Sequence, residues 1–365
     1  MDDGPSGMRL DSGKKAFSLP NGTLLASTFN PALNTELFEF LGMEMVKNNV
    51  ECLLGPGMNI HRHPLNGRNF DYFSEDPVLT GIIGSAQLKG LQKSCVTGTI
   101  KHFACHNQEY KRHFVNPVVS ERALREIYLK GFEIAVKNGA DSIMTTYGPL
   151  NGVYTAGNYD LNTVVLRKQW GFKGIVMTDW WAHVSEEGKE ATKTNFAAMG
   201  RAQNDLYMCV PGATADVGDN LREELKEGKI TIGELQRSAI NICAFFLNKT
   251  VLDRVYGNEP EMEITGAEEG FDDMPHEVEY IKIPIEGCVD LSEVPAGKDT
   301  EYFFGIEFSE TGHYEVTIEA KSLVVNPLAQ RPVLLYINTL PILSFTFNGL
   351  GEWTTMSGVF RFVNT

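Results

Sequence analysis

The chain has 365 residues, 42% of them hydrophobic and 22% charged, which is enough for one core of roughly 250 residues and a second, smaller one. Acidic residues outnumber basic residues by 47 to 32, so the formal net charge is -15, and no dense run of Lys or Arg occurs. Nucleic acid and anionic membrane surfaces are therefore not expected as partners. No apolar run approaches the roughly 18 residues of a membrane span.

The six cysteines lie on scattered, mostly apolar stretches, and none forms a Cys-x-x-Cys pair. This pattern is typical of reduced core thiols and favours a cytoplasmic location over a secreted one. The chain opens with Met-Asp-Asp-Gly-Pro-Ser-Gly, which resembles the interior of a longer sequence, so localisation stays open.

Helical and strand patterns alternate over the first 250 residues. Apolar positions at a 3.6-residue period and capping residues predict helices at 34–48, 78–92, 120–139, 162–171, 221–227 and 232–247. Apolar runs between them predict strands at 51–54, 96–103, 140–147, 174–182 and 205–210. Strands and helices alternating at this spacing predict an α/β fold with a parallel sheet, and the number of units predicts a (β/α)8-like barrel, complete or incomplete, over residues 1–250.

The pattern changes after residue 250, where helical periods vanish. Short alternating runs between Gly, Pro and Asn turns predict an antiparallel β-sandwich over residues 275–365. The acidic stretch 251–274 is the predicted linker. The chain ends where a sandwich would need one more strand, so we expect this second domain to be truncated. A structural or spacer role is favoured for it over independent ligand binding.

The stretch Gly-Ile-Val-Met-Thr-Asp-Trp-Trp-Ala at 174–182 predicts a buried strand that ends in a carboxylate, Asp179. Parallel α/β folds place their chemistry at this end of a strand. The alternative is that Asp179 caps a following helix. The nine residues alone do not decide between the two.

Further polar or sulfur-bearing side chains follow the predicted strands or lie in the loops after them. They are Asp3, Arg68, Lys101, His102, Met144 and Tyr147. We expect them to converge on one face of the barrel, as a polyhydroxylated ligand requires, because each ligand hydroxyl must exchange its water bonds for fixed ones. Trp180 and Trp181 would offer aromatic platforms.

Each of these residues also has a simpler explanation when taken singly. His102 could be a core histidine, Arg68 a partner of Glu75 or Asp76, and Trp181 an ordinary core residue. Their common position after successive strands favours a shared site.

Four motifs occur in a fixed order between Asp3 and Thr250. They are Gly-Arg-Asn-Phe-Asp-Tyr-Phe-Ser-Glu-Asp-Pro at 67–77, Lys-His-Phe at 101–103, Met-Thr-Thr-Tyr at 144–147 with Asn-Gly at 151–152, and Trp-Gly-Phe-Lys-Gly-Ile-Val-Met-Thr-Asp-Trp at 170–180. In order and spacing this set resembles glycoside hydrolase family 3.

The resemblance implies a retaining mechanism with Asp179 as the nucleophile. It implies that the non-reducing sugar is held by Asp3, Arg68, Lys101 and His102. By the same resemblance, Tyr147 on the strand that carries Met144 steadies the nucleophile, and Trp180 lines the next subsite. No cofactor or metal is implied.

Most members of the family act on β-glucosides, and others act on xylosides or N-acetylglucosaminides. The last group usually carries a Lys-His-Phe-Pro-Gly-His pattern, but Ala104 and Cys105 follow Phe103 here. The resemblance therefore implies a β-glucosidase whose substrates are β-glucosides or cello-oligosaccharides.

Retention requires a second, protonated carboxyl group about 5 to 5.5 Å from the nucleophile. The candidates in or after the right loops are Glu109, Glu121, Glu186 and Glu187, although each is more typical of a solvated surface. In the family the acid commonly comes from a separate α/β sandwich domain, and nothing in 251–365 resembles one. The resemblance thus implies a complementary polypeptide or domain that supplies the acid/base, and a domain-permuted enzyme of which this chain is the later part.

Asp179 itself needs a depressed or ordinary pKa to remain anionic. We expect Lys101 and Arg68 to help, because an opposite charge favours the ionised form.

Two other classes of protein stay open. A non-catalytic sugar-binding barrel would keep the polar ring but lose the nucleophile, and the presence of Asp179 counts against it. A metal-dependent barrel hydrolase could use His61, His63 and His102, but the first two are two residues apart in a predicted loop and lack an obvious third ligand.

Overall fold

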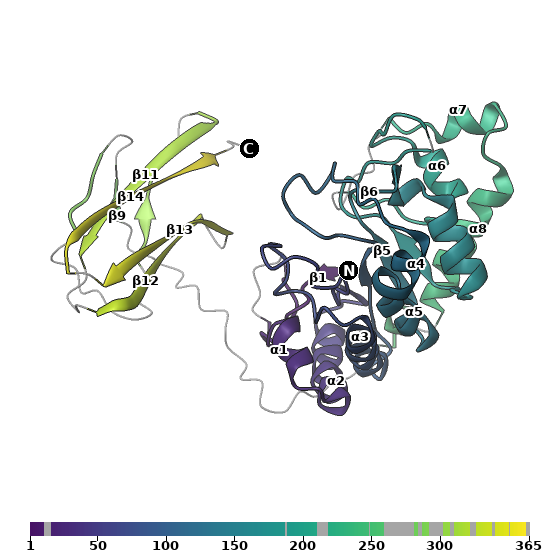
Figure 1. Ribbon diagram of the computed structural model, residues 1–365, viewed down its shortest axis with the longest axis horizontal. Coiled ribbons are helices and arrows are strands. Elements are labelled where there is room, and N and C mark those ends of the chain that lie inside the picture. The colour runs from purple at the N-terminus through teal and green to yellow at the C-terminus, as the bar shows by residue number, and fades with distance from the viewer. Residues whose placement is uncertain are drawn as a thin grey trace. The chain divides into compact units, whose positions relative to one another are not determined.

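The computed structural model describes residues 1–10, 16–186, 188–209, 218–247 and 249–258, and in the later part of the chain residues 281–283, 287–291, 302–306, 310–321, 326–337, 340–349 and 351–362. The chain divides into two compact units, Met1–Glu269 and Gly270–Thr365 (Figure 1).

Two three-stranded sheets of the first unit are built from short parallel strands. One sheet contains β1 (Asp2–Asp3), β2 (Cys52–Leu54) and β3 (Thr97–Gly98), and a second contains β4 (Ile100–Phe103), β5 (Ser142–Thr145) and β8 (Ile175–Met177). A single residue separates β3 from β4, and a parallel bridge from Met177 to Leu206 adds the next segment. The predicted parallel sheet is confirmed, so the carboxyl ends of successive strands meet at one edge.

Helices lie between these strands and after β8. They are α1 (Gly22–Ser27), α2 (Pro31–Lys47), α3 (Pro77–Gln92), α4 (Glu121–Ala123), η1 (Leu124–Tyr128), α5 (Lys130–Lys137), η2 (Thr155–Gly157), η3 (Asp160–Gln169), α6 (Phe196–Arg201), α7 (Leu221–Lys226), α8 (Ile232–Phe246) and α9 (Thr250–Val255). A hairpin of β6 (Pro149–Leu150) and β7 (Val153–Tyr154) precedes η2.

The chemistry of the chain explains where the long helices begin and how they pack. Asn30 and Asp76 cap α2 and α3, each followed by a proline at the first helical position. Thr231 and Glu234 form a capping box at α8. Figure 1 shows α2 and α3 side by side, and Gly90 permits this approach because a Cβ there would lie 2.4 Å from the Thr35 carbonyl oxygen.

The described residues form four buried apolar clusters, and the two largest lie between helices and strands. In one of them Phe103 of β4 meets Phe132 of α5 edge to face at 5.3 Å, and both side chains are fully buried. In the other, Phe38 of α2 packs with Leu53 of β2. Burial of such side chains contributes roughly 1.5 to 3 kcal/mol each, so this packing holds the sheet edge in place.

Two predicted helices differ in detail from the structure. The helix predicted at 120–139 is interrupted by the π-helical turn η1, and the one predicted from Asn162 begins at Asp160 and is π-helical throughout. The first residues of the predicted linker form α9, where Thr250 donates 2.7 Å hydrogen bonds to Glu51. Residues 259–274 of that linker lie outside the described residues.

The second unit is built from paired strands. β11 (Gly312–Lys321) pairs antiparallel with β14 (Trp353–Phe362), and β12 (Asn326–Ile337) pairs antiparallel with β13 (Leu340–Gly349). Phe345 and Phe347 are buried, and a Cβ at Gly358 of β14 would lie 2.9 Å from Leu343 of β13. One pair departs from the antiparallel prediction, because β9 (Ile281–Lys282) and β10 (Phe304–Gly305) run parallel.

All six cysteines are free thiols. Within the described residues, no helix combines the length and apolar character needed to cross a membrane.

Candidate active site

A cavity of about 860 Å³ opens at the carboxyl edge of the parallel strands. Every side chain that the sequence singled out for the sugar and the nucleophile lines it: Asp3, Arg68, Lys101, His102, Met144, Tyr147, Asp179 and Trp180. Trp181, the second predicted aromatic platform, lines it too, and lining residues that were not predicted as sugar-binding are Arg9, Phe70, Asp71, Glu109, Arg112, His113 and Lys193. The structure thus brings the predicted set together.

Asp179 follows the last residue of β8 by two positions, and only 5% of it is exposed. The Trp180 N–H donates a 2.8 Å hydrogen bond to Oδ1, and Oδ2 accepts none from the residues that the structure describes. The helix-cap alternative is wrong, because the next helix begins only at Phe196. Asp179 thus lines the cavity with one buried carboxylate oxygen that lacks a hydrogen-bond partner among the described residues.

Burial raises the pKa of Asp179 above its ordinary value of 3.8. The Trp180 amide, the Lys101 charge and the Tyr147 hydroxyl act in the opposite direction but do not reverse the shift. The expectation of a depressed or ordinary pKa is therefore wrong. The physical reason is that burial of the carboxyl group outweighs the hydrogen bonds and charges that favour its ionised form, Lys101 among them.

Arg68 binds two other residues of the cavity. Its Nε and Nη2 reach Oδ2 of Asp71 at 2.6 and 2.5 Å, so its partner is not the predicted Glu75 or Asp76. Its Nη1 lies 3.1 Å from Nε2 of His102. Because a guanidinium only donates, Nε2 must accept this bond.

The second ring nitrogen of His102 must then carry the proton, and Nδ1 donates to the Tyr72 hydroxyl at 3.1 Å. Burial, together with the Arg68 charge, lowers the pKa of His102 well below 6.5, so the ring is neutral at pH 7. His102 Nε2 lies 3.7 Å from Oδ2 of Asp179, and this contact is not an ion pair.

Asn59 was not predicted and fixes the backbone of His102. Its side-chain amide donates to the His102 carbonyl oxygen and its Oδ1 accepts from the His102 N–H, both at 2.9 Å. No sequence signal distinguishes this asparagine from others, since its role depends on the loop after β2 meeting β4.

The Asp3–Lys101 pair forms another part of the wall. Burial acts to raise the pKa of Asp3, but the Lys101 ammonium and the Gly4 N–H lower it below its ordinary value. Asp3 is therefore an anion at neutral pH, and the pair presents one acceptor and one donor to the cavity.

Of the proposed acids, Glu109 alone among the described candidates lines the cavity. Its carboxylate accepts from His106 at 2.5 Å and from Arg112 at 3.0 Å. Burial would raise its pKa, yet His106 and Arg112 lower it, so Glu109 is ionised at neutral pH. Arg112 also lies 4.5 Å from the centre of the Tyr147 ring.

The remaining acid candidates lie elsewhere. Glu121 pairs with Arg125 on the exposed face of α4, and Glu186 pairs with Lys189 and Arg201. Glu187 lies outside the described residues.

Aromatic and sulfur side chains supply the apolar surface. The Trp180 and Trp181 rings lie 5.7 Å apart, and Trp181 is 44% exposed, so it is not a core residue. Met144 is almost fully buried, and Trp180 packs against its cluster. The two indole rings thus give the cavity lining an aromatic surface.

The three histidines of the metal alternative do not meet. His61 binds the Asn69 carbonyl oxygen at 2.8 Å, His63 accepts from the Leu65 N–H, and His102 lies in the cavity. In the described part of the chain, no three His, Cys, Asp or Glu side chains are close enough to hold a metal ion.

Fold and cavity together define the class: an α/β protein with a pocket lined by carboxylates, cations and aromatic side chains at the carboxyl edge of parallel strands. Residues 6–244 match the glycosyl hydrolase family 3 N terminal domain, so the chain belongs to glycosyl hydrolase family 3.

Relatives agree with this placement. A β-glucosidase of Ruminococcus albus is 52% identical over 354 residues, covering 96% of this chain and 37% of that protein. A β-glucosidase of Rhizobium radiobacter is 40% identical over 245 residues, covering 66% of this chain and 28% of its own length.

Solved structures show the same likeness. A β-glucosidase from Paenibacillus barengoltzii is 46% identical with a TM-score of 0.68, covering 98% of this chain and 38% of that one. β-Glucosidase 3B from Thermotoga neapolitana, solved with α-D-glucose, is 40% identical with a TM-score of 0.64, covering 72% and 37%. The chain thus spans less than two fifths of these proteins.

Proposed function

We propose that this chain is the nucleophile-bearing part of a retaining β-glucosidase that releases terminal non-reducing β-D-glucose. The observation that supports this most directly is the buried Asp179, which has one carboxylate oxygen without a hydrogen bond from any described residue and lies in a cavity ringed by paired charges. The names of the relatives in the same family agree with a β-glucoside substrate.

The architecture we propose is a (β/α)8-like barrel over residues 1–250, complete or incomplete, a linker over 251–274 and a β-sandwich over 275–365. The barrel is supported by parallel segments that neighbour each other in chain order, up to the bridge at Leu206. The sandwich is supported by two antiparallel pairs with Phe345 and Phe347 buried.

In the proposed reaction, Oδ2 of Asp179 attacks the anomeric carbon and the bond to the aglycone oxygen breaks. The aglycone leaves with the bonding electron pair and takes a proton from the acid. Water then attacks the glycosyl-Asp179 ester at the anomeric carbon, gives its proton to the conjugate base and releases β-glucose with retained configuration. Tyr147, whose hydroxyl acts on Asp179, steadies the nucleophile.

The ring of side chains around Asp179 supplies the hydrogen bonds for glucose. Asp3 and Lys101 offer an acceptor and donors, and Arg68 offers the guanidinium edge that Asp71 and His102 hold in place. Bonds to charged groups are the stronger ones. Trp180 would line the next subsite.

We propose that the acid/base comes from a complementary polypeptide or domain. A general acid must be protonated before it acts, and the cavity carboxylates other than Asp179 are paired with cations: Asp3 with Lys101, Asp71 with Arg68, and Glu109 with Arg112. The lowered pKa of Asp3 and of Glu109 supports this reading.

Covalent labelling tests the proposal. A 2-deoxy-2-fluoro β-glucoside with a dinitrophenyl leaving group should add one fluoroglucosyl mass to the chain, and peptide mapping should place it on Asp179. Asp179→Ala is the control and should remain unlabelled. A label on another carboxylate would move the role there, and no label at saturating reagent would contradict the nucleophile assignment.

A further inference from the structure

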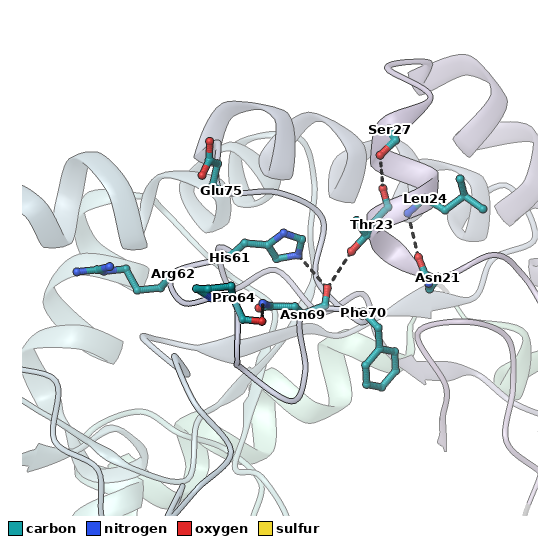
Figure 2. Close-up of a pocket in the computed structure, with 10 residues that line it drawn as sticks. All are labelled: Asn21, Thr23, Leu24, Ser27, His61, Arg62, Pro64, Asn69, Phe70 and Glu75. Atoms are coloured by element: carbon teal, nitrogen blue, oxygen red, sulfur yellow. Dashed lines mark hydrogen bonds between the residues drawn. The ribbon is translucent and has the colours of Figure 1, made fainter. Parts of the chain in front are cut away.

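A second cavity, of about 770 Å³, opens beside α1 and the loop 61–75. Figure 2 shows α1 on one side of it, Arg62 and Glu75 on the other, and His61, Pro64 and Asn69 between them. Phe70 lines this groove and also the Asp179 cavity, and it is 55% exposed. The two cavities therefore share one aromatic wall.

Hydrogen bonds hold the groove in shape. The Asn69 carbonyl oxygen accepts from His61 Nε2 at 2.8 Å and from the Thr23 hydroxyl of α1 at 2.9 Å. The Asn69 amide donates to the His63 carbonyl oxygen at 2.8 Å, and Arg62 Nε donates to the Tyr128 hydroxyl at 3.0 Å. A groove ordered in advance loses little conformational entropy when it binds a ligand.

The chemistry of its lining suits a neutral, hydroxylated molecule. A carbonyl oxygen only accepts, so His61 Nε2 donates to it, and Nδ1 is the ring nitrogen left for a ligand. Arg62 adds donors, and Glu75 adds acceptors of opposite charge. Exposed apolar surface comes from Leu24 and Phe70. Mixed donors and acceptors around apolar patches are what a sugar with polar edges and an apolar face requires.

We propose that this groove is an additional carbohydrate subsite for β-linked gluco-oligosaccharides of three or more units. The non-reducing glucose occupies the Asp179 cavity, the chain passes over Phe70, and the distal glucose units lie between α1 and Arg62. This inference rests on the proposed β-glucosidase function.

Competition kinetics with the full chain test it. The parent hydrolyses dinitrophenyl β-glucoside in the presence of glucose, cellobiose or cellotetraose, and we expect cellotetraose to inhibit about tenfold more tightly than cellobiose. The double variant Arg62→Ala/Glu75→Ala should reduce this advantage to about twofold or less, with glucose inhibition and aryl glucoside turnover unchanged. Arg122→Ala/Glu126→Ala removes a matched, exposed pair that lines neither cavity and should keep the advantage.

Titration calorimetry of Asp179→Asn with the same sugars repeats the comparison without turnover. Equal affinity for cellobiose and cellotetraose, or an advantage that persists in Arg62→Ala/Glu75→Ala, would overturn the subsite. A different outcome is that the parent hydrolyses no aryl glucoside while Asp179→Asn still binds cellotetraose more tightly than cellobiose. That result would contradict the proposed function and leave the groove supported.

Discussion

The amino and carboxyl edges of the parallel strands in the first unit both hold charged side chains, but they differ in how completely these are paired. At the amino edge, Glu51 binds Arg254 and Asp141 binds Lys249 at 2.6 Å. At the carboxyl edge, Asp179 retains an oxygen with no hydrogen bond from the described residues. In parallel α/β folds the amino edge serves stability and the carboxyl edge serves chemistry. The unpartnered oxygen at the carboxyl edge is a cost in stability that agrees with the proposed role of Asp179.

The largest expected effect comes from Asp179→Asn. Loss of the nucleophile should lower hydrolysis of dinitrophenyl β-glucoside by roughly 10⁴-fold or more. The same change should raise Tm at pH 7, because it removes a buried charge with an unpartnered oxygen.

The sign of the stability effect can be checked against pH. A carboxyl group whose pKa is raised by folding stabilises the folded state at low pH, and this contribution is lost as pH rises through the folded pKa. The Tm difference between Asp179→Asn and the parent should therefore grow above that pKa and shrink in acid. A variant that melts lower than the parent at pH 7 would contradict the account of the carboxyl edge.

A second prediction concerns the source of the general acid, which we propose to be a complementary polypeptide or domain. General acid help contributes about 10² to 10⁴-fold and matters most for poor leaving groups. The ratio of the hydrolysis rate of dinitrophenyl glucoside to that of cellobiose should therefore be far higher for the isolated chain than for the chain with the complementary segment added. Adding that segment should restore cellobiose cleavage. Efficient cellobiose cleavage by residues 1–365, shown pure by mass spectrometry, would place the acid within this chain. Glu109, Glu186 and Glu187 would then be mutated first.

The contrast between the edges also shows what the sequence could reveal. Apolar runs that stop at polar residues predict where strands end. The sequence could therefore place Lys101 and Asp179 at the carboxyl edge of the parallel strands. The direction of the Asp179 pKa shift could not be read, because burial depends on packing from distant segments. The contact of Asn59 with His102 could not be predicted for the same reason. The hydrogen bond from Thr250 to Glu51 at the amino edge also joins residues far apart in the chain. Local periodicity contains no signal for such long-range pairs.

The third prediction tests the amino edge. Glu51→Ala should lower the free energy of unfolding by about 3 kcal/mol, because it leaves the largely buried Arg254 without its carboxylate. Arg122→Ala removes an exposed ion pair and should cost at most about 1 kcal/mol. Chemical denaturation measures both. The kcat of folded Glu51→Ala should match that of the parent. A large fall in kcat would show that the amino edge contributes to activity as well as to stability.

Glucose binding provides a fourth prediction. Alanine changes at Asp3, Arg68 or Lys101 should weaken glucose affinity by about ten- to hundredfold, since a hydrogen bond to a charged group is worth roughly 1.5 to 3 kcal/mol. His102→Ala should have the smallest effect, because its ring is neutral. Calorimetry measures all four, and unchanged affinity throughout would place the sugar site elsewhere.

The smallest effect is a shift in the pH profile. The acid limb of kcat/KM for dinitrophenyl glucoside should lie above pH 3.8, because burial raises the pKa of Asp179 and the attacking group must be ionised. Lys101→Met removes a positive charge that favours the ionised form, so Asp179 should hold its proton to still higher pH and the limb should move upward. Lys137→Met, at an exposed lysine paired with Glu133, is the matched control and should leave the limb in place. A limb that stays fixed or moves to lower pH in Lys101→Met would show that Lys101 does not act on Asp179. In that case Asp3 would neutralise the charge of Lys101 as completely as Arg254 and Lys249 neutralise Glu51 and Asp141 at the amino edge.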